Sequence, residues 1–244
     1  MAHVAYQPVD EPKPVAPDVW IVDSGPLRLA GIPIPVRMSV VRLPDGGLLL
    51  HSPTRFSFEL LRKLDALGPV QHLVAPNTVH WTYAREWQSH CPAAITWGAP
   101  GLSRRKAVVE AGLRIDRELA DGTTQEWQEA IETVIVRGKG ITEAALLHRP
   151  SRTLVLTDLV VNVEPKKLPL PVGIGVRLVG AAAPHGRAPF YARAAFKAGG
   201  EPAAAAAERL VALQPDRVVF AHGRWFEANG ADELRRSLDW LLPS

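Results

Sequence analysis

Cysteine is nearly absent from this chain of 244 residues, because Cys91 is the only one. A single cysteine excludes an intramolecular disulfide, and it excludes a zinc site built from several thiolates. Apolar runs are also short, since none reaches the roughly 18 residues that a membrane-spanning helix needs. The segment from Met1 to Asp10 carries neither the basic nor the apolar part of a secretion signal. We therefore expect a cytoplasmic protein that has no membrane partner.

A concentrated basic surface is absent as well. The chain has 28 Lys and Arg residues against 25 Asp and Glu, a formal net charge of +3, and its basic clusters are short and scattered. Proteins that bind nucleic acid usually present a basic stripe, often with aromatic platforms. We therefore expect no nucleic-acid partner. With 47% hydrophobic and 22% charged residues, the composition is that of an ordinary globular protein.

The order of the apolar runs predicts an α/β protein. Strands come first and a β/α alternation follows, and the same order then repeats in the second half of the chain. The Asp45-Gly46 pair between two apolar runs indicates a hairpin. The predicted strands are 19–22, 36–43, 48–50, 72–75, 94–97, 131–136, 143–147, 153–156 and 217–221. Two such halves predict an αββα sandwich, in which two mixed sheets pack together and helices lie outside.

Proline marks the two segments that we expect to be irregular. Residues 1–17 contain four prolines and are predicted to be an irregular lead-in, so that 18–244 form one domain. Residues 163–173 contain Pro165, Pro169 and Pro171, which predicts a loop or lid with no regular element. We expect the stretch 163–188 to shape the substrate pocket.

Three polar residues lie shortly after predicted strands. They are His80, Asp158 and His222. Ligands of α/β proteins gather outside the carboxyl ends of the strands, and two imidazoles with one carboxylate suit Zn, Fe or Mn. Taken singly, each has a plainer interpretation, because a histidine at a strand end is usually hydrogen-bonded and Asp158 can cap a turn. The combination predicts a metal site at His80, Asp158 and His222.

Four segments that end predicted strands share a pattern. They are Leu48–Pro53, His72–His80, Thr153–Asp158 and Val218–Gly223. In these segments the chain resembles the metallo-β-lactamase superfamily, whose corresponding strands end in Asp-Thr-Gly, His-x-His-x-Asp-His, Gly-Asp and Gly-His-Gly. The resemblance covers about residues 18–242. The segments His51-Ser-Pro53, Ala75-Pro-Asn-x-x-His80 and Pro100-Gly-Leu102 favour an uncharacterised branch of that superfamily.

The departures from this pattern remove the histidines of the first metal position and one Asp. Ala75 and Asn77 replace its first two histidines, Val79 replaces the Asp, and the third histidine falls near Gly140. The remaining residues, His80, Asp158 and His222, all belong to the second position. The resemblance therefore implies one divalent metal ion, Zn or Fe with Mn as an alternative, bound by a reduced ligand set.

Four further residues are weaker candidates. His51 and Asn77 are expected to orient the metal ligands, because a coordinated imidazole usually needs a hydrogen-bond partner. Each also has a plainer interpretation, as a polar strand end and as a turn residue. His185 and Arg187 lie in the predicted lid and are expected to meet the substrate, unless they serve only a turn.

The leading functional hypothesis is a mononuclear metal-dependent hydrolase that acts on a small molecule. A two-His, one-carboxylate set also fits a non-haem iron enzyme of redox or oxygen chemistry. A third hypothesis is a metal-free binding protein on a decayed hydrolase fold, which the changes at Ala75, Asn77 and Val79 favour. The substrate and the oligomeric state stay open at this point.

Overall fold

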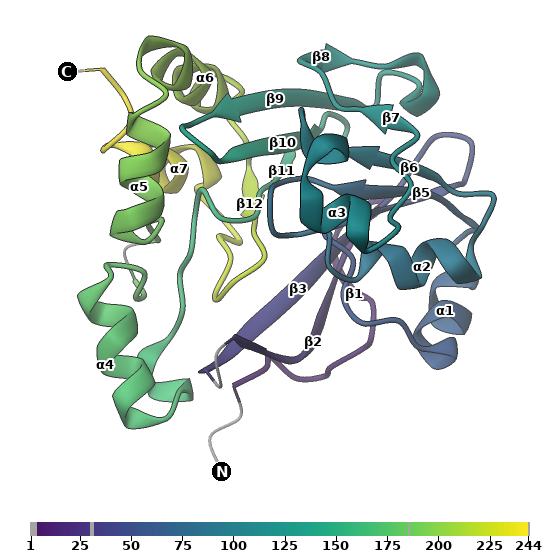
Figure 1. Cartoon of the computed structure of the whole chain (residues 1–244), viewed down its shortest axis with the longest axis horizontal. Coiled ribbons are helices and arrows are strands. Elements are labelled where there is room, and N and C mark those ends of the chain that lie inside the picture. Colours follow the sequence, from purple (N-terminus) through teal and green to yellow (C-terminus); the bar gives the residue numbers. More distant parts are fainter. Residues whose placement is uncertain (1–3, 30–31, 185, 244) are drawn as a thin grey trace.

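The chain folds into two mixed β-sheets with helices on their outer faces (Figure 1). The structure is a computed structural model, and it describes residues 4–29, 32–184 and 186–243. The first sheet has seven strands and the second has five. This arrangement is the αββα sandwich that the order of apolar runs predicts.

The first sheet is built from the amino-terminal half of the chain, in the order β1-β2-β3-β4-β5-β6-β7. Neighbours from β1 to β4 are antiparallel, and neighbours from β4 to β7 are parallel. The predicted hairpin turn joins β3 to β4, where Gly46 has a φ of 87° that favours glycine. The strands are β1 (Lys13–Ala16), β2 (Val19–Leu29), β3 (Ile32–Arg42), β4 (Leu48–His51), β5 (Val70–Ala75), β6 (Ile95–Gly98) and β7 (Arg117–Glu118).

The second sheet has the order β12-β11-β10-β9-β8. Its first pair, β11 with β12, is parallel, and the other pairs are antiparallel. The parallel pair matters for function, because the chain leaves both strands at the same edge of the sheet. The strands are β8 (Gly122–Thr123), β9 (Ile131–Arg137), β10 (Thr142–His148), β11 (Thr153–Val155) and β12 (Arg217–Val219).

Helices cover the outer face of each sheet. Helices α1 and α2 pack on the first sheet through Leu60, Leu64 and Trp87, and α6 and α7 pack on the second through Leu210 and Leu234. Each such leucine, fully buried, contributes roughly 2–3 kcal/mol. The helices are α1 (Phe58–Asp65), α2 (Ala84–His90), α3 (Lys106–Glu110), α4 (Leu170–Leu178), α5 (Phe190–Lys197), α6 (Glu201–Ala212) and α7 (Gly230–Leu238), and the 3₁₀ turns are η1 (Leu102–Arg104), η2 (Gln125–Trp127) and η3 (Pro165–Lys167).

The two sheets meet at a common apolar core. Leu49 and Val74 of the first sheet belong to the same buried cluster as Ile135, Leu146 and Val155 of the second. Alternate residues of β4 and β5 point instead toward α1 and α2, so these central strands are buried on both faces. The packing of the sheets therefore determines which strand ends come together at the rim.

Two segments differ from the prediction. The lead-in 1–17 contains strand β1, which pairs with β2 and extends the first sheet. The segment 163–173, predicted as a loop, contains η3 and the start of α4. The loop prediction was wrong because Pro169 and Pro171 stand at the helix start, where backbone N–H groups need no intrahelical partner.

Candidate metal centre

His80, Asp158 and His222 converge at one rim of the sandwich. The Nε2 atoms of the two histidines are 3.2 Å apart, and each lies 3.4 Å from Oδ1 of Asp158. The three side chains keep 12%, 18% and 11% of their surface exposed, so the cluster is reachable from solvent. Among the described residues, this is the group of His, Cys, Asp and Glu side chains whose geometry suits a metal ion.

Strand ends bring the three residues together. Asp158 and His222 follow β11 and β12, which run parallel and keep their register beyond the strands, since Leu156 N donates to Val219 O. His80 arrives from the other sheet, in the turn after β5. The sequence could predict that each residue follows a strand, and the sheet packing makes the three ends adjacent.

The hydrogen bonds of the two imidazoles leave both Nε2 atoms facing the cluster. Nδ1 of His222 is 2.7 Å from the carbonyl oxygen of Pro35. A carbonyl oxygen only accepts, so Nδ1 of His222 donates the hydrogen bond, and Nε2 is the ring nitrogen that can offer a lone pair to a ligand. Nδ1 of His80 is 2.7 Å from Oγ of Ser52, which can accept in the same way. Two such lone pairs beside a carboxylate oxygen repel one another unless a metal ion or a proton lies between them.

The spacing of these atoms fits the face of a metal tetrahedron. Zinc bonds of about 2.0–2.1 Å in tetrahedral geometry place neighbouring ligand atoms about 3.3–3.4 Å apart. The three observed separations are 3.2, 3.4 and 3.4 Å. The donor set and its spacing thus fit one divalent ion, and the fourth position of such an ion would face away from the protein ligands.

Asp158 is held in its ionised form. Burial by itself would raise its pKa, but the interaction with His80 and the hydrogen bonds with His222 and His80 hold the pKa of Asp158 well below its usual range. Oδ2, which faces away from the histidines, accepts from the Asn77 amide at 2.7 Å. The carboxylate therefore offers Oδ1 to the cluster with its orientation already set.

Asn77 is a positioning residue for two of the three cluster members. Its amide nitrogen also donates to Thr157 Oγ1 at 2.9 Å, and its Oδ1 accepts the backbone N–H groups of Val79 and His80 at 2.8 and 2.7 Å. One fully buried amide thus ties the turn that carries His80 to the strand end that carries Asp158. The sequence predicts an orienting role for Asn77, which stays a prediction, and these hydrogen bonds are consistent with it.

Glu143 is a buried support that sequence reasoning missed. Its carboxylate accepts the backbone N–H groups of Thr157, Asp158 and Leu159 at 2.7–3.1 Å. Burial, followed by the charge of Asp158, raises the pKa of Glu143 to about 7. A glutamate inside the apolar strand Thr142–His148 was the available signal, because a buried acid almost always has partners.

His51 and Ser52 support the cluster in different ways. His51 is almost fully buried at the end of β4, and burial lowers its pKa to about 3, so the ring is neutral. Of the two, Ser52 contacts a cluster residue directly through its hydrogen bond to His80. Ser52 adopts a φ of 55°, an uncommon conformation for a residue other than glycine. The orienting role predicted for His51 stays a prediction, and the hydrogen bond to His80 is made by its neighbour Ser52.

The backbone around His222 is held by a buried arginine and a required glycine. Arg37 Nη1 donates to the carbonyls of Phe220 and Gly223 at 3.0 and 2.8 Å, and Arg37 pairs with buried Asp23 at 2.7 Å. Gly223 has a φ of 95°, and a Cβ there would lie 2.1 Å from the carbonyl oxygen of Asn162. The residue after His222 therefore has to be glycine.

The two remaining candidates are His185 and Arg187. His185 lies outside the described residues. Arg187 is half-buried and pairs with Asp239, just beyond α7, so its guanidinium is tied to the surface of the second sheet's helices. The substrate role assigned to these two residues stays a prediction.

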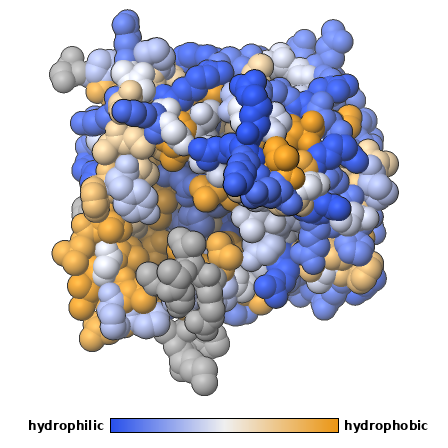
Figure 2. All heavy atoms as spheres, viewed as in Figure 1, coloured by the Kyte–Doolittle hydropathy of each residue, from blue (hydrophilic) through white to orange (hydrophobic). Residues whose placement is uncertain are grey.

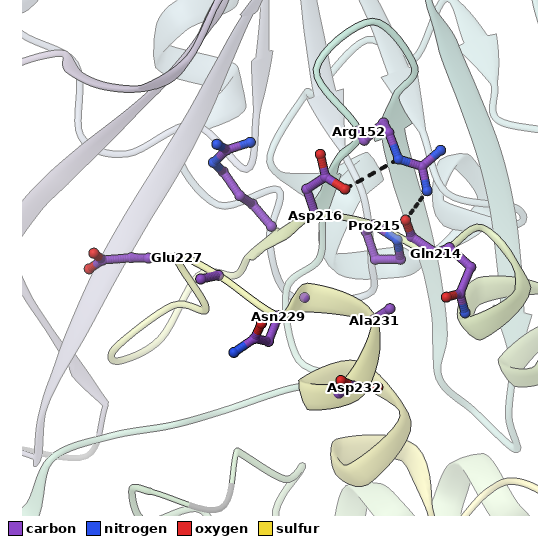
Figure 3. A pocket seen from close by; sticks show the side chains of 11 residues that line it. Arg152, Gln214, Pro215, Asp216, Glu227, Asn229, Ala231 and Asp232 are labelled. Carbon is purple, nitrogen blue, oxygen red and sulfur yellow. Dashed lines mark hydrogen bonds and ion pairs between the residues drawn. The ribbon is translucent and has the colours of Figure 1, made fainter.

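A surface hollow lies at the opposite ends of β11 and β12. Arg152 precedes β11, and its Nε lies 3.3 Å from Asp216 Oδ1 at the start of β12, while its guanidinium also donates to the carbonyl of Gln214 (Figure 3). Within the described chain, the lining of this hollow contains none of the predicted site residues. Arg152 and Asp216 pair with each other at this hollow and tie the start of β11 to the start of β12.

Solved structures with a similar fold include metallo-β-lactamases. The metallo-β-lactamase from Pontibacter korlensis is 16% identical with a TM-score of 0.62, over 95% of this chain and 98% of that one. The enzyme from Hirschia baltica is 12% identical with a TM-score of 0.62, over 96% and 98%. FIM-1 from Pseudomonas aeruginosa, solved in its mono-zinc form, is 12% identical with a TM-score of 0.59, over 94% and 93%.

These similarities confirm the metallo-β-lactamase fold that the strand-end segments predict. A search among curated proteins finds no match to the sequence. A family described as a domain of unknown function matches residues 17–174, which include the turns that carry His51, Asn77, His80 and Asp158. That match spans well over half of the chain, so the protein belongs to the family Domain of unknown function (DUF4336).

Proposed function

We propose that the protein is a mononuclear metal-dependent hydrolase of a small molecule, with the ion held by His80, Asp158 and His222. The observation that carries the proposal is the 3.2–3.4 Å triangle of two Nε2 atoms and one carboxylate oxygen. When bound there, a divalent ion would polarise a substrate oxygen and lower the pKa of a water molecule. The fold, shared with metallo-β-lactamases, supports the reaction class.

The residues around the cluster prepare it for such an ion. Pro35 and Ser52 hold the imidazoles by Nδ1, which leaves Nε2 free to coordinate. Asn77 holds the outer oxygen of Asp158, so the carboxylate can contribute one oxygen and one negative charge. These partners reduce the reorganisation that binding requires, as hydrogen-bonded partners of metal ligands generally do.

The position where the superfamily pattern has an Asp bears Val79, which is 58% exposed at the rim. Among the described residues, the cluster itself contains one carboxylate, and it is engaged with both histidines. Asp158 is thus poorly suited to serve as a separate proton acceptor. We therefore propose substrates with a good leaving group, whose hydrolysis needs little proton transfer from the protein.

The metal content of the protein tests the proposal directly. The protein is purified without chelator or affinity tag, and its metals are measured by elemental mass spectrometry. We expect about one equivalent of zinc or manganese, which is lost in the double variant His80→Ala, His222→Ala. His90→Ala is the matched control, because His90 is an exposed histidine on α2 outside the cluster.

Activity is then screened with chromogenic esters, lactams and phosphodiesters, before and after metal removal. Hydrolysis that depends on the ion and disappears in the double variant supports the proposal. If neither protein binds metal after supplementation, the proposal fails and a metal-free binding protein becomes the better explanation.

A second candidate function rests on the same donor set. Two histidines and one carboxylate also suit Fe(II) in redox and oxygen chemistry. This candidate predicts iron in the purified protein and an absorption spectrum that changes when oxygen is admitted. A stoichiometric zinc content would exclude it in favour of the hydrolase.

A further inference from the structure

Helix α4 presents an apolar stripe to solvent. Leu170, Ile174 and Leu178 follow one another at four-residue spacing and are 75%, 48% and 79% exposed. Residues at this spacing lie on one side of a helix. The space-filling view shows apolar side chains gathered over the region of α4 (Figure 2). Soluble proteins seldom leave such a stripe uncovered, and exposed apolar patches of this kind mark interaction surfaces.

The start of α5 extends this stripe. Phe190 and Tyr191 are 57% and 62% exposed, and their rings lie edge to face at 5.7 Å. The backbone N–H of Phe190 donates to the carbonyl of Val179, which directly follows α4. The two helices therefore place five large exposed side chains on adjoining segments, and we call this surface the α4–α5 face.

The segment that forms the α4–α5 face carries charge of one sign. Residues 165–200 contain no Asp or Glu. Two of the basic residues have acidic partners, since Lys167 lies 4.0 Å from Glu164 and Arg187 pairs with Asp239. Four others form no ion pair within the described part of the chain. These are Lys166, Arg177, Arg193 and Lys197.

Basic groups stand at both ends of the apolar stripe. Lys166 is exposed and precedes α4 by a few residues. Arg177 is exposed beside Leu178 in the last turn of α4. The guanidinium of Arg193 packs against Gly180, since a Cβ added to Gly180 would lie 3.2 Å from its Nη2. An occupant of the α4–α5 face would thus meet apolar groups in the middle and positive charge at the ends.

Two properties of the α4–α5 face decide between possible occupants. Its apolar residues stand out from helices, whereas soluble ligands bind in concave pockets. A second copy of the chain would bring the same positive charges against this face, and like charges disfavour association. An anionic lipid surface supplies both the apolar layer and the negative charge. We propose that the α4–α5 face docks the protein peripherally on a membrane surface that contains anionic lipids.

This docking revises the expectation that no membrane is a partner. Among the described residues, no helix has the length and apolar character needed to traverse a bilayer, and peripheral docking requires none. Docking through this face does not depend on a bound metal.

Vesicle co-sedimentation of the full chain tests the proposal. We expect binding to phosphatidylcholine vesicles that contain phosphatidylglycerol, weak binding to phosphatidylcholine alone, and a loss of binding at high salt. The triple variant Leu170→Ser, Ile174→Ser, Leu178→Ser should bind about tenfold more weakly. The double variant Lys166→Glu, Arg177→Glu should lose a similar factor in affinity, but only for the anionic vesicles. All five side chains are exposed, so these variants should fold.

Matched controls come from η1, which carries Arg104, and from α3, which carries Val109 and lies over the other sheet (Figure 1). Val109→Ser with Arg104→Glu changes one 62% exposed apolar residue and one exposed arginine, and it should bind vesicles like the unchanged protein. The metal-site variant His80→Ala, His222→Ala should also bind, which separates this proposal from the hydrolase. Equal binding by the triple variant overturns the proposal. The proposal is also overturned if the unchanged protein binds no vesicles and instead forms a dimer that the triple variant does not form.

Discussion

Two groups of polar side chains flank Asp158, and they differ in how completely their hydrogen bonds are used. On the closed side, Asn77 and Glu143 are 0% exposed, and their side-chain atoms bond to Asp158, to Thr157 and to backbone N–H groups. On the open side, His80 and His222 are partly exposed and direct Nε2 atoms at one another. The side chains of the closed side fix the position of Asp158, whereas on the open side the Nε2 atoms of His80 and His222 are available to a ligand.

The closed side includes the position where the superfamily pattern has a metal-binding histidine and this chain has Asn77. The adjacent space is a filled network, because Asn77 and Glu143 also form a backbone bridge between the two sheets. Ala75, at the other such position, packs among apolar residues including Ala84 and Leu102. Asn77 and Ala75 are thus held by a hydrogen-bonded network and by apolar packing, which keep the candidate site in place.

The largest expected effect comes from breaking the closed side with Glu143→Ala. Three buried N–H groups would lose their acceptor, and each such group costs about 1–3 kcal/mol. We expect the free energy of unfolding to fall by about 3 kcal/mol or more, measured by urea denaturation. Glu143→Gln keeps a carbonyl acceptor and should lose clearly less. A loss below about 1 kcal/mol for Glu143→Ala would contradict the supporting role.

The open side should instead respond to metal. Zinc that binds the folded state alone stabilises it by about 2.7 kcal/mol at a concentration of one hundred times the dissociation constant. We expect added zinc to raise the melting temperature of the unchanged protein, measured by calorimetry, and to leave that of the His80→Ala, His222→Ala variant unchanged. An equal rise in both proteins would mean that zinc binds elsewhere.

A smaller effect should follow from substitution of Ser52, whose hydroxyl is hydrogen-bonded to Nδ1 of His80 on the open side. Ser52→Ala removes the partner of Nδ1, and loss of such a partner typically weakens metal binding about tenfold. Ser52→Gly also removes the hydroxyl but relieves the positive φ of 55°. Titration calorimetry should therefore show weaker binding in both variants, with unfolding stability preserved in Ser52→Gly. Unchanged affinity in both would assign Ser52 to the turn alone.

The smallest effect concerns His72, a buried histidine at the other end of β5 from the cluster. Burial lowers its pKa, and Nδ1 accepts from Trp97 Nε1 at 3.1 Å, so the folded protein holds a neutral ring. The unfolded chain takes up the proton first, so the contribution of His72 is complete above about pH 6.5 and declines as the pH falls.

The slope for this one group cannot exceed about 1.4 kcal/mol per pH unit. Urea denaturation at several pH values should show a weaker pH dependence in His72→Gln, whose side-chain carbonyl can still accept from Trp97. An identical pH dependence would show that His72 does not contribute.

Local signals were sufficient for much of the fold. The hairpin at Asp45-Gly46, the buried strands and the leucines of α7 follow from turn chemistry and from periodicity, which act over a few neighbouring residues. The start of α4 was missed because proline both ends helices and begins them. The leucines of α4 are also exposed, so α4 does not follow the usual pattern of a helix whose apolar side faces the core.

The sequence by itself determined which residues follow strands, and it thereby singled out His80, Asp158, His222 and Asn77. Only the tertiary structure decided that they meet, because β5 belongs to one sheet while β11 and β12 belong to the other. Glu143 lies 15 positions before Asp158 along the chain, yet it holds the backbone of that residue. Such a contact depends on sheet packing and strand register, and short sequence patterns encode neither.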